Sequence, residues 1–375
     1  MEGSNRNPPN SPTRNRSKKT KTTVEALSDR ETLDLPPEIL IEILARLPVK
    51  SLLRFKCVSK SWLSLISSPQ FIKTHLKIST QNPNLSSHRL MLTICNPDFD
   101  LIHCSVQSLM FGPLTVAHNI DYPKKNPHCA VWIVGSCNGL ICVAIDENDM
   151  FLWNPTTRTS RKLPPVAVKL RQGFYYIWGF GYDESSDDYK VVGVFCVFGN
   201  EGLYESVVKI YSLRADSWKS IEGFEGGVPL DDSATRGGSE FKWNIVSLDL
   251  RTEDYGTVEQ PDYGEGCFDS YLGVLGEGIC VLCNYEKVRA DLWVMKEYGV
   301  KESWTKVVSI PYDDDPAMFL CSVPLWILDD GEILLALGTE LVVYSPRDNC
   351  YRYPETSNVA PFLEADMYVE SLVSV

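Results

Sequence analysis

The sequence predicts an α+β protein in which a short helical segment is followed by a larger, separate all-β domain. Apolar residues recur with helical periodicity only between residues 33 and 77. From residue 78 onward, short runs rich in β-branched and aromatic residues alternate with Gly, Pro, Asn and Asp. A repeated hairpin pattern in that region favours a propeller-like domain of about six blades over an irregular β-sandwich, which is the alternative.

Composition excludes several classes of protein. With 375 residues, 44% hydrophobic and 23% charged, the chain is typical of soluble globular proteins, and no run reaches the ~18 apolar residues of a membrane span. The first residues contain no apolar core, so no secretory signal peptide is predicted. We therefore expect a protein of the cytoplasm, the nucleus or both. The 12 cysteines lack regular spacing and are expected to be reduced core residues.

The N-terminal 30 residues are predicted to be a disordered basic tail, because they contain almost no large apolar side chains. Five basic residues fall within eight positions, namely Arg14, Arg16, Lys18, Lys19 and Lys21. This cluster resembles a nuclear-import patch, although most basic tails of this kind are simply solvated segments.

The net charge of −13 is distributed unevenly along the chain. Residues 1–23 carry six Lys and Arg against one Glu, and residues 33–77 carry seven against three acids. Residues 78–375 consequently hold a net charge of −20. Nucleic acid is not an expected ligand of this acidic part, because phosphate contacts require Lys and Arg.

The helical segment, residues 31–77, is predicted to contain three helices. Asp34 is placed to cap the first helix and Pro48 to end it. Ser51 can cap the second, and Ser59 or Lys60 begins the third, which ends before Pro69. One further turn carries the apolar residues Phe71, Ile72 and Leu76.

Two repeated signals define the β-hairpins expected in residues 78–375. In the first, a glycine turn precedes an apolar strand, a polar turn and a second strand with an aromatic residue, as from Gly139 to Trp153. In the second, two large side chains stand seven residues apart around a polar turn. The pairs are Tyr211 and Trp218, Leu248 and Tyr255, and Tyr344 and Tyr351. A degenerate unit fits between residues 90 and 123, where Leu90–Ile94 and Leu114–Val116 stand out.

The stretch Leu35–Trp62, which includes the sequence Leu-Pro-Val-Lys-Ser-Leu at its centre, resembles the F-box of plant proteins. The remainder is similar to the plant F-box-associated, kelch-like interaction domain. This similarity rests on the motifs Gly135–Leu140, Leu152–Arg158, Gly179–Asp183 and Asp188–Val192. The resemblance implies a substrate-recognition subunit of an SCF-type ubiquitin ligase that joins cullin through a Skp-type adaptor.

One interval departs from the family pattern. Members usually contain a further strand pair between the segments that match Trp218 and Ile245–Leu250, whereas Lys219–Trp243 has no comparable apolar strand here. We therefore expect one incomplete blade, with that interval forming a mobile loop.

The resemblance and the apolar helix faces together predict the adaptor-binding residues. They are Leu35, Pro36, Ile39, Ile43, Leu44, Leu47, Pro48, Leu52, Val58 and Trp62. Leu40 and Leu53 are expected to form the core of the helical segment itself. A propeller scaffold that works without a ligase is the alternative function.

Catalytic and metal chemistry is not indicated by the sequence. All five histidines precede residue 130, so the bulk of the β domain has no imidazole for acid–base work. Cys280 and Cys283 form a lone CxxC whose side chains point to opposite faces of a strand. The acidic stretches Asp183–Asp188 and Asp313–Asp315 lack the pattern of a calcium loop and are read as solvated turns. We therefore predict a non-catalytic protein without a cofactor or metal.

The aromatic run from Phe174 to Phe180 is the candidate substrate-recognition segment, because Tyr and Trp dominate binding hot spots. Within it, Tyr175, Tyr176 and Trp178 are the predicted substrate-binding residues. Strand and core packing is expected for the rest of the run.

Overall fold

The computed structural model describes residues 36–375 apart from residue 96 and the segments 147–148, 169–174, 199–203, 224–243, 265–268, 277, 286–287 and 312–321. Backbone contacts divide the chain into residues 1–42 and 43–375, and this boundary falls inside the first helix.

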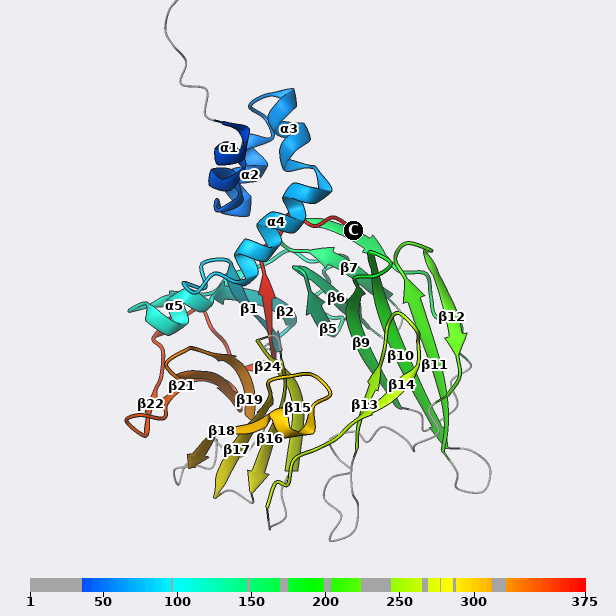
Figure 1. Ribbon diagram of the computed structural model, residues 1–375, viewed down its shortest axis with the longest axis vertical. Helices are drawn as coiled ribbons and strands as arrows, with labels where there is room; N and C mark the ends of the chain where they lie inside the picture. The colour runs from blue at the N-terminus through cyan, green and yellow to red at the C-terminus, as the bar shows by residue number, and fades with distance from the viewer. Residues whose placement is uncertain are drawn as a thin grey trace, which may run out of the picture. The chain divides into compact units, whose positions relative to one another are not determined.

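Four helices occupy the described part of the predicted helical segment (Figure 1). They are α1 (Pro37–Ala45), α2 (Val49–Phe55), α3 (Lys60–Ile66) and α4 (Pro69–Thr80). The three-helix expectation is wrong because the single turn foreseen after Pro69 is a helix of 12 residues. Helix α3 begins at Lys60, in agreement with the predicted start at Ser59 or Lys60, and the Ser59 hydroxyl caps it by accepting a hydrogen bond from the Trp62 amide at 3.2 Å. Ser51 does not cap α2, which begins two residues before it.

The rest of the described chain is almost entirely β-structure. The first strands are β1 (His88–Cys95), β2 (Phe99–Ser105), β3 (Thr115–Val116), β4 (His118–Asn119), β5 (Val131–Cys137), β6 (Leu140–Ile145), β7 (Asp149–Asn154), β8 (Thr159–Lys162), β9 (Tyr175–Asp183), β10 (Asp188–Phe198), β11 (Tyr204–Ser212) and β12 (Ser217–Ile221). They are followed by β13 (Ile245–Leu248), β14 (Tyr255–Val258), β15 (Asp269–Leu275), β16 (Gly278–Tyr285), β17 (Arg289–Met295), β18 (Trp304–Pro311), β19 (Ser322–Ile327), β20 (Ile333–Leu337), β21 (Glu340–Ser345), β22 (Cys350–Arg352), β23 (Thr356–Ser357) and β24 (Phe362–Val369). A short 3₁₀ turn, η3 (Lys301–Ser303), precedes β18.

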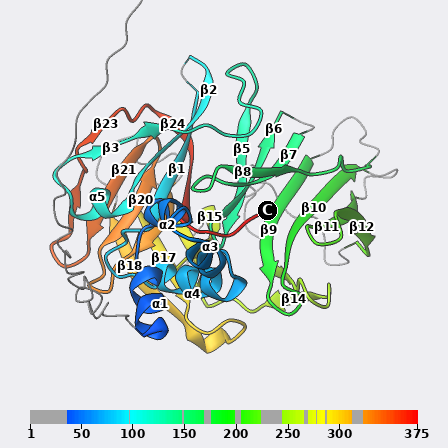
Figure 2. The ribbon, with the colours of Figure 1, turned by 90° about the horizontal axis from the view of Figure 1, so that it is seen from above.

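These strands form five four-stranded sheets and two ribbons of two strands in the described part of the chain. The sheets are β24-β1-β2-β4, β5 to β8, β9 to β12, β15 to β18 and β19 to β22, and the ribbons are β13-β14 and β23-β3. Contacts between β24 and β5, β5 and β9, β15 and β19, and β19 and β24 connect one sheet to the next (Figure 2). The predicted propeller-like domain is confirmed, with five four-stranded sheets in the described residues where about six units were expected.

The hydrophobic core is divided among the interfaces between neighbouring sheets, as a propeller requires. Each interface combines residues of two sheets: Leu92 with Val343, Met91 with Val143, Leu152 with Val191, and Leu282 with Leu335. At a fifth interface, Ile245 and Val258 of the β13-β14 ribbon pack with Val281 and Cys283. The ribbon therefore occupies a blade position, to which the described residues contribute two strands.

The predicted hairpins are present in register. Tyr211 lies opposite Trp218, Leu248 opposite Tyr255, and Tyr344 opposite Tyr351. Gly139, with a φ of +80°, turns the chain from β5 to β6. A Cβ at Gly139 would lie 2.5 Å from the Val369 carbonyl oxygen. The lack of a side chain at Gly139 therefore also allows β24 to pack closely against this turn. The expected loop over Lys219–Trp243 lies outside the described residues from position 224 onward.

Three features of the β domain were not predicted. A helix, α5 (Val106–Phe111), interrupts the region that we expected to be all β. The run Leu114–Val116 contributes β3, which pairs in parallel with β23 instead of joining the first blade. Strand β24 pairs antiparallel with β1 and thereby joins the end of the domain to its beginning.

Candidate protein-interaction surfaces

The helical segment exposes large apolar side chains. On α1, Ile39 and Ile43 stand one turn apart and are 45% and 46% exposed. Val58, which follows α2, is 61% exposed, and Leu63 of α3 is 47% exposed. Exposed aliphatic residues at this density on short helices indicate a surface that another protein covers.

The ten predicted adaptor-binding residues do not share one environment. Pro36, Ile39, Ile43, Pro48 and Val58 are exposed, and Leu47 and Trp62 are half-buried. Leu44 and Leu52 are at most 2% exposed, so contact with an adaptor would require them to leave the core. Leu40 and Leu53, which we expected in that core, are half-buried, and Leu35 lies outside the described residues.

Sequence reasoning missed Leu63, which is among the more exposed aliphatic residues of the helices. The family motif includes a tryptophan at the neighbouring position, Trp62, and does not extend to Leu63. Trp62 packs against Phe55 with ring centroids 5.4 Å apart, so its indole also stabilises the junction of α2 and α3.

The β domain carries an aromatic groove at the junction of the β5–β8 and β9–β12 sheets. This groove has a volume of about 160 Å³, and Tyr176, Trp178, Phe195 and Trp218 line it together with the chain that follows β8. Tyr176 is 41% exposed, and its ring centroid lies 6.0 Å from that of Trp178. The structure thus brings two of the three predicted substrate-binding residues to one groove, while the side chain of Tyr175 lies outside the described residues.

Rigid contacts hold the walls of the aromatic groove. Trp218 donates its indole N–H to the Pro164 carbonyl oxygen at 2.7 Å, which fixes the segment after β8 against β12. Asp149 stands at the rim, and hydrogen bonds from Lys124 and Lys162 hold the pKa of its carboxyl below the ordinary value. Because this carboxylate is paired, the apolar rings are the main feature that the groove offers to a ligand.

Burial moves the pKa values of two histidines and two cysteines of the β domain away from neutral pH. Burial lowers the pKa of both His88 and His103 to about 4, so these imidazoles are neutral at pH 7. Burial also raises the pKa of Cys280 and of Cys283 to about 12. The two thiols belong to different core clusters, which confirms that they point to opposite faces of β16. Among the described residues, no group of three or more His, Cys, Asp or Glu could hold a metal ion.

The acidic turn between β9 and β10 is solvated only in part. Glu184 and Asp187 are exposed as expected, whereas Asp183 and Asp188 are each 5% exposed. Asp183 accepts hydrogen bonds from the Ser185 hydroxyl at 2.6 Å and the Lys190 ammonium at 3.0 Å. Lys190 also donates to the Leu250 carbonyl oxygen, which ties the β13-β14 ribbon to the neighbouring sheet. These carboxylates are structural.

Comparison with known proteins assigns both the helical segment and the β domain to known domain families. Residues 32–74 match the F-box domain model, and residues 91–375 match the model of the F-box-associated beta propeller domain. No helix in the described ranges has the length and apolar character of a membrane span.

Curated relatives match nearly the full length of the chain. An F-box/kelch-repeat protein of Arabidopsis thaliana is 33% identical over 91% of this chain and 96% of its own length. The F-box protein CPR1 of Arabidopsis thaliana is 29% identical over 90% of this chain and 88% of its own. The chain therefore belongs to the family of F-box proteins that carry an F-box-associated β-propeller domain.

Proposed function

We propose that this protein is the substrate-recognition subunit of an SCF-type ubiquitin ligase. Its F-box helices bind a Skp-type adaptor, and through it a cullin, while the β domain binds a protein that is then ubiquitinated and degraded. The protein itself acts as a non-catalytic adaptor. The basic cluster in the N-terminal tail is the basis for proposing that it works in the nucleus as well as the cytoplasm.

The observation that carries this proposal is the exposed apolar surface of a segment that matches the F-box domain model. Burying one Ile side chain contributes about 1.5 to 3 kcal/mol, so an exposed side chain such as Ile43 can add substantially to a protein–protein contact. The aromatic groove on the β domain supports the second half of the proposal, because it offers Tyr and Trp side chains to a partner.

Copurification with a Skp-type adaptor and cullin tests the adaptor contact. The variant Ile43→Asp should bind the adaptor at least about tenfold more weakly, because it removes apolar contact and places a charge in the interface. Val288→Asp is the matched control, since Val288 is 65% exposed on the β16–β17 turn. Undiminished recovery of the adaptor with Ile43→Asp would overturn the assignment.

A ligase-independent interaction scaffold is the alternative function. It predicts that wild-type protein recovers partners of the β domain without any adaptor or cullin. The two functions therefore differ in whether the wild-type chain copurifies with both ligase subunits.

A further inference from the structure

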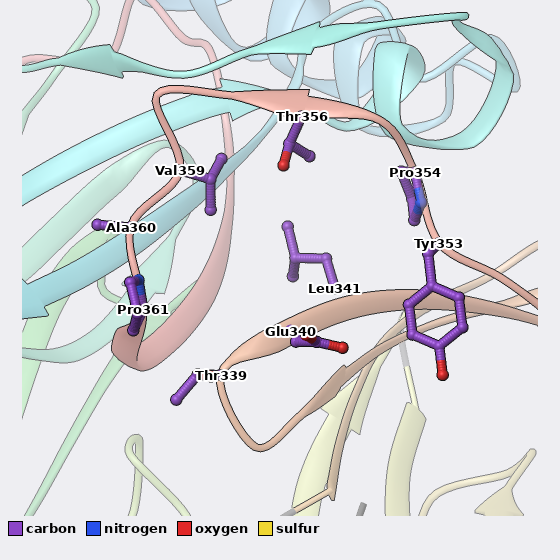
Figure 3. Close-up of a pocket in the computed structure, with 9 residues that line it drawn as sticks. All are labelled: Thr339, Glu340, Leu341, Tyr353, Pro354, Thr356, Val359, Ala360 and Pro361. Carbon is purple, nitrogen blue, oxygen red and sulfur yellow. The ribbon is translucent and has the colours of Figure 1, made fainter. Parts of the chain in front are cut away.

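A second cavity of the β domain, separate from the aromatic groove, has a volume of about 300 Å³. It lies between the β20–β21 turn and the segment that leads from β22 to β24 (Figure 3). Figure 3 shows Leu341 near its centre, with Val359 and Pro361 on one side and Tyr353 on the other. The Glu340 carboxylate points toward the side occupied by Tyr353.

Glu340 is the only charged residue that lines this cavity among the described residues. It is exposed, and in the same described set its carboxylate takes part in no hydrogen bond or ion pair. The guanidinium of Arg352, on β22 of the same sheet, donates to the carbonyl oxygens of Leu109 and Met110 at 3.2 and 2.7 Å and lies 4.0 Å from the carboxylate of Glu332.

The remaining lining mixes apolar and polar groups. Leu341 is 6% exposed, Val359, Pro361 and the ring of Tyr353 form walls, and Thr339 and Thr356 also line the cavity. A cavity with apolar walls and one carboxylate can take a side chain that has an aliphatic stem and a cationic end. The Tyr353 ring can add a cation–π contact, whereas an acidic side chain would meet the like charge of Glu340.

We propose that this cavity binds one Arg or Lys side chain from an extended segment of a partner protein. The inference rests on the proposed function and specifies the class of substrate segment that the β domain takes. The net charge of −20 on residues 78–375 supports it, because an acidic domain attracts basic segments during encounter.

Fluorescence anisotropy with three labelled heptapeptides tests the cavity directly. The first has the sequence Gly-Ser-Leu-Arg-Leu-Ser-Gly, the second replaces Arg with Glu, and the third replaces Arg with citrulline, its neutral isostere. The full-length chain should bind the Arg peptide at least about fivefold more tightly than either of the others. Equal affinity for the Arg and citrulline peptides, or no binding of any peptide, would overturn the proposal.

Three variants test whether the preference for the Arg peptide arises at this cavity. Glu340→Gln should lose the preference for Arg over citrulline, and Glu340→Lys should prefer the Glu peptide. Glu297→Gln removes the same charge from the exposed turn after β17 and should retain the wild-type preference. Thermal denaturation of each variant checks that the exposed substitution leaves the fold intact. If Glu340→Gln and Glu297→Gln weaken binding of the Arg peptide equally, the site is not at this cavity.

The outcome is independent of the adaptor test. Loss of the peptide preference together with intact copurification of the Skp-type adaptor would reject the cavity while leaving the adaptor role standing. A retained peptide preference in a chain that recovers no adaptor or cullin would reject the ligase role alone.

Discussion

A single amide side chain connects the second blade to the end of the described chain. Asn154 is fully buried at the end of β7. Its Nδ2 donates to the carbonyl oxygens of Ser371 and Val373 at 3.1 and 2.7 Å. Its Oδ1 accepts from the amides of Thr156 and Thr157 at 2.8 and 3.1 Å. The same side chain therefore shapes the β7–β8 turn and fixes the segment that follows β24.

Replacing this amide should cost considerable stability. Asn154→Ala leaves buried backbone groups without partners, and we expect the free energy of unfolding to fall by roughly 2 to 4 kcal/mol. Urea denaturation measures the change. Asn119→Ala is the control, because Asn119 is exposed and its amide makes one bond to Asp100, at 3.1 Å. A loss as small as that of the control would show that water or rearranged backbone satisfies the buried groups.

Asp366 introduces a pH dependence at the junction of the first and second sheets. It lies opposite Met91 in the pairing of β24 with β1. Burial, together with the nearby Glu364 carboxylate, raises the pKa of Asp366 to about 7. Glu364 itself accepts a hydrogen bond from the Ile133 amide of β5, at 3.4 Å. The folded chain therefore holds a proton on Asp366 at a pH at which the unfolded chain has released it.

The sign of the effect follows from linkage. Because the pKa of Asp366 is higher in the folded chain, the stabilisation is fully present below about pH 4 and is lost as pH rises through 7. The Asp366→Asn variant should gain about 2 to 3 kcal/mol of stability relative to wild type as pH is raised from 5 to 8. Taking this difference cancels the titration of His88 and His103, which both chains share. A difference that does not change with pH would contradict the raised pKa.

The sequence could identify the apolar residues of the helical segment but not the side of each helix that faces its own core. Helix α1 has apolar residues at Ile39, Leu40, Ile41, Ile43 and Leu44, which surround most of its circumference. In a helix of nine residues, periodicity alone does not choose between Ile43, which is exposed, and Leu44, which is buried. Tertiary packing makes that choice, so only part of the predicted adaptor surface is exposed.

Hairpins were the most predictable elements of the β domain because their signals are local. Alternating apolar residues and turn residues such as Asn138 and Gly139 determine register within a few positions. The pairing of β24 with β1 and of β23 with β3 joins residues that are far apart in sequence, so no local sequence pattern predicts this pairing. The length of α4 was also missed, since its sequence contains the β-branched residues Ile72, Thr74 and Ile78.

The β13-β14 ribbon should be the least protected hairpin of the domain. It has four paired positions, and neither of its strands pairs with another strand in the described structure. We expect amides of residues 244–256 to exchange with solvent faster than those of residues 139–153 or 331–344, which belong to four-stranded sheets. Hydrogen exchange followed by mass spectrometry measures this order. Equal protection in the three segments would mean that the ribbon is covered by further strands.

At the scale of the whole β domain, stability depends on closing the circle of sheets. The sheet that contains β1 and β24 contributes residues to two core clusters, so removing its edge uncovers two neighbouring sheets. Strand β24 is critical because it belongs to the first sheet and also contacts β5 and β19. Arg89 of β1 reinforces this closure through an ion pair with Glu370, at 3.2 Å.

Truncation at the two ends should therefore have opposite consequences. Deleting residues 362–375 removes β24 together with the segment that Asn154 holds, and we expect the cooperative thermal transition to disappear. Deleting residues 1–30 should leave the melting temperature unchanged, because that tail offers almost no apolar side chains to a core. Differential scanning calorimetry distinguishes these cases. A sharp transition at the wild-type temperature after the C-terminal deletion would refute the role of β24.

The position of β24 late in the sequence also determines when the first sheet can be completed during protein synthesis. Arg89 and Glu370, which meet across the closed sheet, are separated by 281 residues in sequence. At ribosomal rates of about 5 to 20 residues per second, β1 leaves the ribosome roughly 15 to 55 seconds before its partner strand. During that delay the edge of β1 is open to pairing with other nascent chains, so chaperone demand should be greatest just before β24 emerges. The F-box helices emerge earlier still, so they can fold before the β domain is closed.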